Sequence, residues 1–405
     1  MKLIFKYFYN IFVVISISII LRLILLDTYG DTTLENEWGS LFNNLKNHGV
    51  LSYRSFEGQL IPSVYMPPLY VYFIFIIDLI IPSSFNLVKL ILIAQILISA
   101  FSLFYFYRIN LILFNKKLSF ISTYIFALFP MNIYSSIQIS SISLQIFLSV
   151  IFLYIVLNIL TKKNEYKNYL ILSFISGLTI LLRGEFILIF ILTIIFLLYS
   201  KKINFFKMIS IILMTVIIIS PYLLRNYISF EKITITKSFG YNLWKGNNID
   251  STIEGSESEL AFNTDSIREK IDNLKKDNLY DFNYDKIFLD SSLSFINDNP
   301  ILFFERYIKK FFTFTFLNLN SNYPNYYHPL NILSFIFLSV LFLISIIFIL
   351  KKKKSIYLNY LLLNLFFTIA VFSIFFILPR YKLVILPIQL IIINYWLRKY
   401  IKKGV

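Results

Sequence analysis

Long apolar runs recur along almost the whole chain, and they restrict its fold more than any other feature. A helix that crosses the hydrocarbon core of a bilayer needs about 20 residues. Runs that approach this length lie at residues 10–27, 86–107, 117–134, 143–160, 168–183, 185–200, 204–222, 330–350, 355–378 and 383–397. Only 15% of the residues are charged, against about 25% in a typical soluble domain. The sequence therefore predicts an all-α polytopic membrane protein with about ten transmembrane helices.

Two further apolar segments are too short or too broken to count as spans. Residues 69–81 lie between Pro67-Pro68 and Pro82, and residues 301–317 are interrupted by four charged side chains. Short or irregular segments are tolerated at membrane depth where protein surrounds them. We expect both to form interfacial or re-entrant helices, although they would also fit as a crossing pair.

The basic residues indicate how the chain is oriented. Lys and Arg collect on the cytoplasmic side of a membrane, and with the two short segments excluded the basic clusters all fall on one face. These clusters are Lys2/Lys6, Arg108/Lys116/Lys117, Lys162/Lys163/Lys167, Lys201/Lys202, Lys351 to Lys354 and Arg398 to Lys403. Nineteen of the 22 acidic residues lie at 27–57 or 231–305, on the other face. The pattern predicts a multi-pass cell (inner) membrane protein with cytoplasmic termini and an outward functional surface.

Composition excludes several other classes of function. The net charge of +16 does not indicate nucleic-acid binding, because the lysines flank apolar runs as membrane anchors do. Cysteine is absent, which excludes disulfides and thiolate metal sites. His48 and His328 are the only histidines, so a multi-histidine metal site is also excluded. The lipid bilayer is the one partner that composition itself predicts.

The spans divide the chain into three regions. Residues 1–222 form an N-terminal transmembrane region, and its first outer loop is residues 28–85. Residues 223–329 form a non-cytoplasmic loop region, in which 260–274 and 282–296 have apolar residues at helical spacing. Residues 330–405 form a C-terminal transmembrane region.

Three carboxylates follow the first span within seven residues, at Asp31, Glu35 and Glu37. Such groups at a membrane exit could act as a general base toward an acceptor hydroxyl or amine. The alternative is a solvent-exposed helix start, in which the acidic side chains lie near the positive N-terminal end of the helix.

Cationic side chains also stand at membrane exits. Arg183 and Glu185 lie in the turn between two apolar runs, where an ionisable pair faces a cavity or forms a mutual salt bridge. Arg225 lies where the seventh span ends, a depth that suits either a lipid-linked phosphate or a snorkelling arginine in an aromatic belt. Arg380 and Lys382 lie between the last two spans, as membrane anchors or as cations on a face where few are expected.

In chain order these motifs resemble those of one family. The order is the acidic loop, Pro-Pro-Leu-Tyr at 67–70, Arg-Gly-Glu at 183–185, Pro-Tyr-Leu-Leu-Arg-Asn-Tyr at 221–227, Gly-Tyr-Asn-Leu-Trp-Lys-Gly-Asn-Asn at 240–248 and Arg-Tyr-Lys-Leu-x-x-x-Pro at 380–387. From about residue 10 to 390, the chain resembles the bacterial membrane glycosyltransferases of the GT-C superfamily. These are similar to protein O-mannosyltransferases, which use dolichyl-phosphate mannose, and to aminoarabinose transferases. The resemblance implies a GT-C-like helical bundle.

The resemblance also implies an activity and a set of site residues. Such enzymes move a sugar from a polyprenyl-phosphate carrier to a lipid, glycan or protein acceptor outside the cytoplasm, with inversion at the anomeric carbon. The implied base is Glu37, with Glu35 and Asp31 as rivals. The donor phosphate is assigned to Arg225 and Arg380, with Lys382 assisting. The sugar and acceptor cavity is assigned to Arg183, Glu185, Tyr65, Tyr70, Tyr241, Asn242, Trp244 and Asn247.

Two other classes remain as alternatives. A transporter or flippase for lipid-linked glycans would show repeated halves and broken helices at the midplane, and the sequence shows no repeat. A polysaccharide polymerase or ligase would keep similar arginines without needing the early acidic loop. We expect no organic cofactor and no dedicated metal site, but a divalent cation is left open because carboxylates serve either as base or as metal ligands.

Overall fold

The computed structural model describes residues 10–80, 85–161, 165–254, 265–318, 328–351 and 355–401. Within these ranges the chain is mostly helical, with one short β-hairpin. Both termini lie outside the described residues, as do the basic side chains Lys2, Lys6, Lys162, Lys163, Lys352, Lys353, Lys354, Lys402 and Lys403 that contribute to the predicted orientation. The all-α class expected from the sequence is confirmed.

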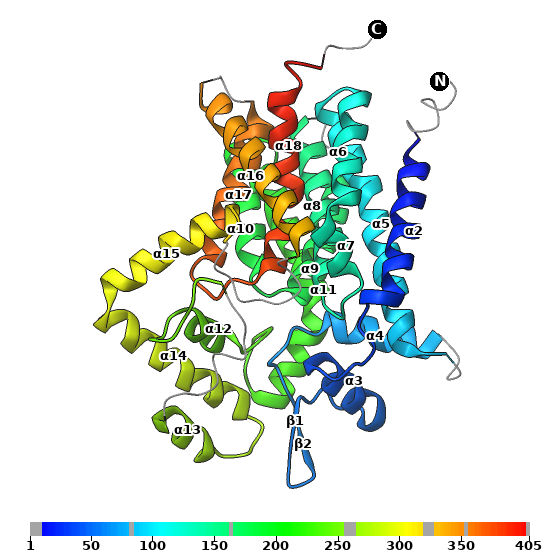
Figure 1. The fold of residues 1–405 in the computed structure, drawn as a ribbon. Helices are drawn as coiled ribbons and strands as arrows, with labels where there is room; N and C mark the ends of the chain where they lie inside the picture. Colours follow the sequence, from blue (N-terminus) through cyan, green and yellow to red (C-terminus); the bar gives the residue numbers. More distant parts are fainter. Residues whose placement is uncertain are drawn as a thin grey trace.

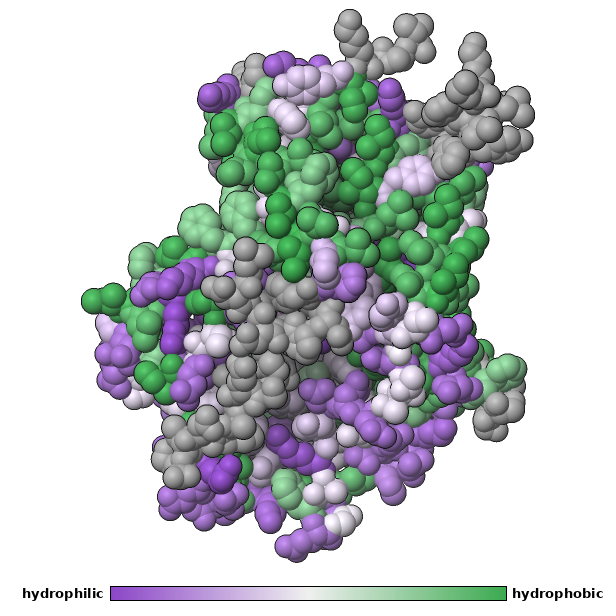
Figure 2. Space-filling model, in the orientation of Figure 1, coloured by the Kyte–Doolittle hydropathy of each residue, from purple (hydrophilic) through white to green (hydrophobic). Residues whose placement is uncertain are grey.

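Five described helices are long and apolar enough to cross a membrane. They are α2 (Ile11–Tyr29), α5 (Leu87–Leu113), α8 (Ile142–Thr161), α11 (Phe205–Phe230) and α16 (Pro329–Leu350). Large apolar side chains on their outer faces are exposed: Ile24 is 63% exposed, Ile217 is 61% exposed and Phe337 is 64% exposed. Apolar surface of this kind, which covers the helices on the face shown in Figure 2, is typical of contact with lipid. The chain is a membrane-embedded helical bundle.

Shorter helices complete the bundle. They are α4 (Leu69–Ile80), α6 (Lys116–Leu128), α7 (Pro130–Ser136), α9 (Tyr166–Leu182), α10 (Phe186–Tyr199), α17 (Ile356–Phe372) and α18 (Leu386–Leu397), with the 3₁₀ turn η2 (Pro379–Val384) before α18. The helices at four predicted spans, α9, α10, α17 and α18, have only 12 to 17 residues. Their length alone does not establish a crossing, so a count of about ten spans stays a prediction.

The predicted span at 117–134 is a broken helix. Its two parts, α6 and α7, meet at an angle of 54°, because Pro130 has no N–H to continue the hydrogen bonds of α6. Asn132 Nδ2 donates to Phe126 O at 3.1 Å, and Arg22 in α2 donates to Ala127 O at 3.1 Å. The fully buried Arg22 therefore gives a hydrogen bond to a carbonyl near the break. Other broken membrane helices pair their freed backbone groups with polar side chains in the same way.

The polar elements gather at one end of the bundle, opposite to the start of α2 and the end of α18 (Figure 1). They are α3 (Glu37–His48), β1 (Arg54–Phe56), β2 (Gln59–Ile61), α12 (Phe239–Gly246), α13 (Asp265–Asp272), α14 (Tyr280–Asp298) and α15 (Pro300–Thr315). The hairpin is absent from the sequence-based expectation. Glu57 and Gly58 have φ values of 51° and 82°, the left-handed pair that a tight two-residue hairpin turn requires.

Several expected elements form with shifted boundaries. The predicted helices at 69–81, 301–317 and 282–296 correspond to α4, α15 and α14. For the one at 260–274, the structure describes α13, and residues 260–264 lie outside the described residues. Helix α11 continues past residue 222 to Phe230, so the start of the outer loop region falls inside a helix.

Candidate functional site

Asp31 is fixed at the point where α2 ends. Its backbone N–H donates to Ile137 O at 3.1 Å, and its Oδ2 accepts from the Ile139 N–H at 2.6 Å. Burial raises the pKa of the Asp31 carboxyl above its usual value, and the Ile139 hydrogen bond and the charge of Arg380 offset this only in part. A half-buried carboxylate with a raised pKa is suited to taking up a proton.

Gln95 holds the segment that fixes Asp31. From the first half of α5, its Nε2 donates to Gln138 O at 2.8 Å and Ser136 O at 3.3 Å. Its Oε1 accepts from the Tyr70 hydroxyl at 2.5 Å, and that hydroxyl lies within electrostatic range of Asp31. Tyr70 and Asp31, both site residues expected from the sequence, therefore belong to one buried network centred on Gln95.

Two arginines flank a single tyrosine ring in the same part of the molecule. The guanidinium carbons of Arg183 and Arg380 lie 5.5 Å and 6.0 Å from the centroid of the Tyr381 ring. Arg183 Nε is buried without a hydrogen-bond partner. No ion pair joins Arg183 to Glu185, although both residues are described and half-buried. The charge of Arg183 is therefore not neutralised by Glu185, and its Nε–H has no acceptor among the described residues.

The other two early carboxylates have surroundings that differ from those of Asp31. Glu35 is exposed, and Glu37 opens helix α3 after the N-cap Asn36, whose side chain accepts from the next N–H groups. Glu37 lies in electrostatic range of Tyr65: burial raises the pKa of the Tyr65 hydroxyl well above its usual range, and Glu37 adds to that rise. Glu37 thus faces an aromatic region, and Glu35 faces solvent.

Arg225 is tied into the first outer loop. Its guanidinium donates to Ser63 O at 3.0 Å, Leu51 O at 3.1 Å and the side chain of Asn226 at 2.8 Å. Ser63 also donates through its hydroxyl to Asp281 at 2.6 Å. These contacts make Arg225 an anchor for the loop, and they engage both of its Nη atoms.

Lys382 is also engaged inside the protein. Its Nζ lies 3.0 Å from Glu254 Oε2, and both side chains are almost fully buried, at 3% and 0% exposed. Burial lowers the pKa of Lys382, while Glu254 opposes the shift. The charge of Lys382 is therefore paired in the interior of the protein.

Helix α12 presents part of the aromatic run expected to meet a sugar. Tyr65 stacks on Tyr53, with ring centroids 5.2 Å apart, and lies 6.1 Å from Tyr241. Trp244 is buried against Phe288 of α14. One aromatic cluster therefore lies between the first loop and α12, and its members are Tyr53, Tyr65, Tyr241 and Trp244.

The two amides assigned to the sugar cavity serve the backbone instead. Asn242 is exposed and donates to Ser238 O at 2.7 Å. Asn247 is buried and donates to Leu243 O and Ile374 O, each at 2.8 Å. The bonds to Ser238 O and Leu243 O stabilise local structure, and the bond to Ile374 O joins the end of α12 to the segment that follows α17.

Helix α12 is capped at both ends by charged side chains from other helices. At its start, Asp285 of α14 accepts from the Tyr241 N–H at 3.0 Å. At its end, Lys310 of α15 donates to Gly246 O at 2.6 Å and Arg306 donates to Asn248 O at 2.5 Å. An acidic group at the N-terminus and cations at the C-terminus match the helix dipole. The aromatic cluster is thereby held in place.

Sequence reasoning missed Gln95, Glu254, Lys310 and Arg22. An arginine inside the first apolar run is a signal that could have singled out Arg22, because ionisable residues are costly in a span. No local pattern marks the other three, whose partners come from distant parts of the chain.

The described residues contain no group of three His, Asp or Glu side chains placed to hold a metal ion. The arrangement offers a partly accessible carboxylate in electrostatic range of Arg380, and Arg380 shares the Tyr381 ring with Arg183. The aromatic cluster lies at the same end of the bundle. Comparison of the chain with protein-family models, with curated proteins and with solved structures finds no match.

Proposed function

We propose that this protein is a membrane glycosyltransferase that moves a sugar from a polyprenyl-phosphate carrier to an acceptor on the outer face of the membrane. The observation that carries the proposal is that the charge of Arg380 acts on the Asp31 carboxyl. The two come from the first and last parts of the chain, and Arg380 lies close enough to lower the pKa of the Asp31 carboxyl. A base beside a cation is what attack on a sugar phosphate requires.

In the proposed reaction, Asp31 takes the proton from an acceptor hydroxyl or amine. The acceptor atom attacks the anomeric carbon from the side opposite to the phosphate, so a new glycosidic bond forms with inversion. The bond between the anomeric carbon and the phosphate oxygen breaks, and polyprenyl phosphate leaves. Arg380 and Arg183 stabilise the negative charge that grows on that phosphate, where fixed cations contribute most.

This assignment changes the roles expected from the resemblance. Arg183 replaces Arg225 and Lys382 as the second phosphate ligand. Its Nε has no partner in the part of the chain that the structure describes, whereas the Nη atoms of Arg225 and the Nζ of Lys382 are engaged. Asp31 is preferred over Glu37 because it combines a fixed carboxylate with a cation in range. The cluster of Tyr53, Tyr65 and Tyr241 offers ring faces for a sugar.

We also propose that the polar end faces outward and that the short helices take part in about ten crossings. Helices α9 and α10 would form a hairpin whose Arg183–Glu185 turn reaches the outer surface. The basic residues at the opposite end, such as Lys116 and Lys201, support this orientation through the positive-inside rule.

The proposal is tested by purified protein in lipid nanodiscs supplied with a panel of polyprenyl-phosphate hexoses and pentoses and an extract of envelope acceptors. Mass spectrometry of released polyprenyl phosphate measures the reaction. We expect release with at least one donor, and its loss in Asp31→Asn by about two orders of magnitude or more, the usual contribution of a general base.

Matched variants separate chemistry from folding. Glu35→Gln removes an exposed carboxylate close by in the sequence and should retain activity. An active Asp31→Asn protein would show that Asp31 is not the base. If Glu35→Gln is inactive at the same time, Glu35 is the base instead. Donors that bind and cross the bilayer without cleavage would instead favour a transporter.

A further inference from the structure

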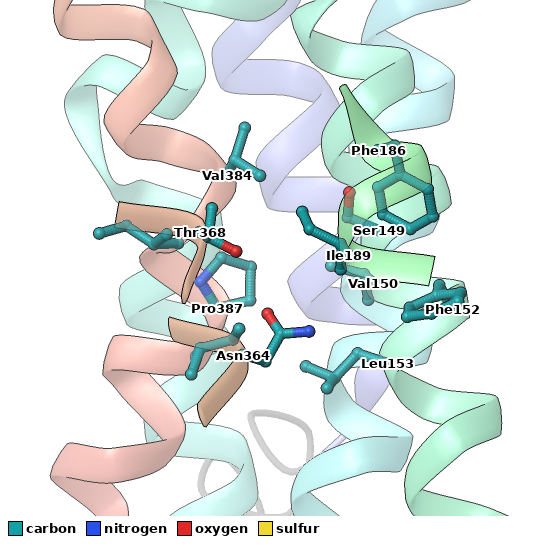
Figure 3. Close-up of a pocket in the computed structure, with 12 residues that line it drawn as sticks. Ser149, Val150, Phe152, Leu153, Phe186, Ile189, Asn364, Thr368, Val384 and Pro387 are labelled. Atoms are coloured by element: carbon teal, nitrogen blue, oxygen red, sulfur yellow. The ribbon is translucent and has the colours of Figure 1, made fainter. Parts of the chain in front are cut away.

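A small cavity lies within the bundle, apart from the candidate site. Helices α8 and α10 form one wall, and α17 with the start of α18 forms the other (Figure 3). Its volume is about 30 Å³, more than the roughly 10–15 Å³ that a cavity needs to hold a water molecule. Phe186 and Val384 are among the lining residues, so the cavity begins just beneath the turns that carry Arg183 and Arg380.

Three polar side chains line this otherwise apolar space. Asn364 and Thr368 come from α17, and Ser149 comes from α8 on the facing wall (Figure 3). Ser149 Oγ is buried without a hydrogen-bond partner. Within the described residues, the Asn364 Nδ2 donates to the Tyr360 hydroxyl at 3.2 Å, and no protein hydrogen bond reaches the Asn364 Oδ1 or the Thr368 hydroxyl.

Unpaired polar groups in the hydrocarbon region carry a large cost. Water is absent from that region, so each unsatisfied group destabilises the fold by several kcal/mol unless something inside the protein pairs with it. A buried water is expected where a space of sufficient size offers two to four polar partners. The cavity offers three, from two helices that no direct side-chain bond joins here.

We propose that this cavity is an internal hydration site that holds one water molecule, at most two, between α8 and α17. The water accepts from or donates to Thr368 and Ser149, and it donates to Asn364 Oδ1. A direct chain already joins α10 to α17, because the Thr193 hydroxyl lies 2.9 Å from the Tyr360 hydroxyl and Tyr360 contacts Asn364. The water extends this polar chain to α8 and so links three helices beneath the candidate site.

The absence of cysteine makes a direct test available. A Ser149→Cys protein in nanodiscs has one thiol, and its S–H stretch is resolved by infrared spectroscopy. Contact with water exchanges S–H for S–D in D₂O. The matched control is Ser176→Cys, because Ser176 is fully buried in α9 and bonds within its own helix to Leu172 O. We expect exchange at position 149 to be at least tenfold faster than at position 176.

Equal and slow exchange at both positions would overturn the proposal. A second measurement stands independently of the cysteine variants. Ser149→Val adds apolar volume, which lowers the midpoint of thermal unfolding if it displaces a bound water and strands Asn364 and Thr368. It raises the midpoint if the cavity is dry, because filling an apolar cavity stabilises a fold. A raised midpoint therefore contradicts the hydration site, and neither result depends on glycosyltransferase activity.

Discussion

Asp31 depends on opposing influences at a single carboxyl group. Burial raises its pKa, and the Ile139 hydrogen bond and Arg380 lower it. As a base, Asp31 works only when it is ionised, so activity rises as pH rises through its pKa in the folded protein. The low-pH limb of the activity profile should therefore lie above the usual range of an aspartate.

Replacing Arg380 should move that limb in a definite direction. Arg380→Gln removes a charge that lowers the pKa of Asp31, so the pKa rises and the low-pH limb of the activity profile moves to higher pH. Arg380→Lys keeps the charge and should leave the limb near its wild-type position, although the maximal rate falls in both variants. The measurement is polyprenyl phosphate release against pH. A limb that stays in place in Arg380→Gln would separate Arg380 from Asp31.

Arg225 should prove structural. Arg225→Met leaves the Ser63 carbonyl without its donor, while Leu51 O keeps the Ser63 N–H at 2.8 Å. A stranded buried acceptor costs about 1 to 3 kcal/mol. We expect a lower thermal midpoint and faster proteolysis of the first outer loop. Donor affinity of the folded fraction should be unchanged, as measured by titration with the donor found active. A large loss of affinity at unchanged stability would restore Arg225 as a phosphate ligand.

At the scale of elements, α12 depends on side chains from its neighbours. Asp285 and Lys310 cap its two ends, and Gly240 allows α14 to approach, because a Cβ there would lie 2.2 Å from the Asp285 carbonyl oxygen. The short helix that holds Tyr241 and Trp244 is thus positioned by α14 and α15 more than by its own sequence.

Lys310 gives this packing a pH dependence. Burial lowers the pKa of Lys310 to about 7, below its value of about 10.4 in an unfolded chain. Between these values the unfolded chain binds more protons, so the free energy of unfolding rises with pH from about 7 to about 10.4. We expect hydrogen exchange of α12 amides, after correction for intrinsic rates, to slow over this range.

The matched variant for that prediction is Lys309→Met, which removes an exposed lysine of the same helix. Lys310→Met should abolish the pH dependence, and Lys309→Met should keep it. Identical profiles in wild-type and Lys310→Met proteins would show that Lys310 does not titrate in this range.

The sequence predicts the long helices of the bundle better than it predicts the contacts of the candidate site. Apolar length predicts α2, α5, α8, α11 and α16, because a run of about 20 apolar residues has few alternatives to a helix in lipid. It does not predict the 54° break, although Pro130 marks the position. The choice of Asp31 among three carboxylates depends on Ile137 and Ile139, which no local pattern connects to it. Contacts of this kind are set by packing.

At the scale of the whole molecule, two ends of different character enclose an apolar band. The band lies over the helices, and the hydrophilic surface gathers where α3, α13 and α14 lie (Figures 1 and 2). Asp31, Arg380 and the aromatic cluster all belong to this hydrophilic end. The proposed reaction uses an acceptor outside the cytoplasm, so this end must face outward.

Sidedness is measured directly by labelling single cysteines in intact cells with a membrane-impermeant maleimide, since the chain has no cysteine of its own. Glu35→Cys reports on the end that carries Asp31, and Tyr166→Cys, 62% exposed in the native chain, reports on the start of α9 at the other end. We predict that position 35 is labelled in intact cells and that position 166 is labelled only after permeabilisation. Labelling in the reverse pattern would place Asp31 in the cytoplasm and contradict the proposed reaction at the outer face.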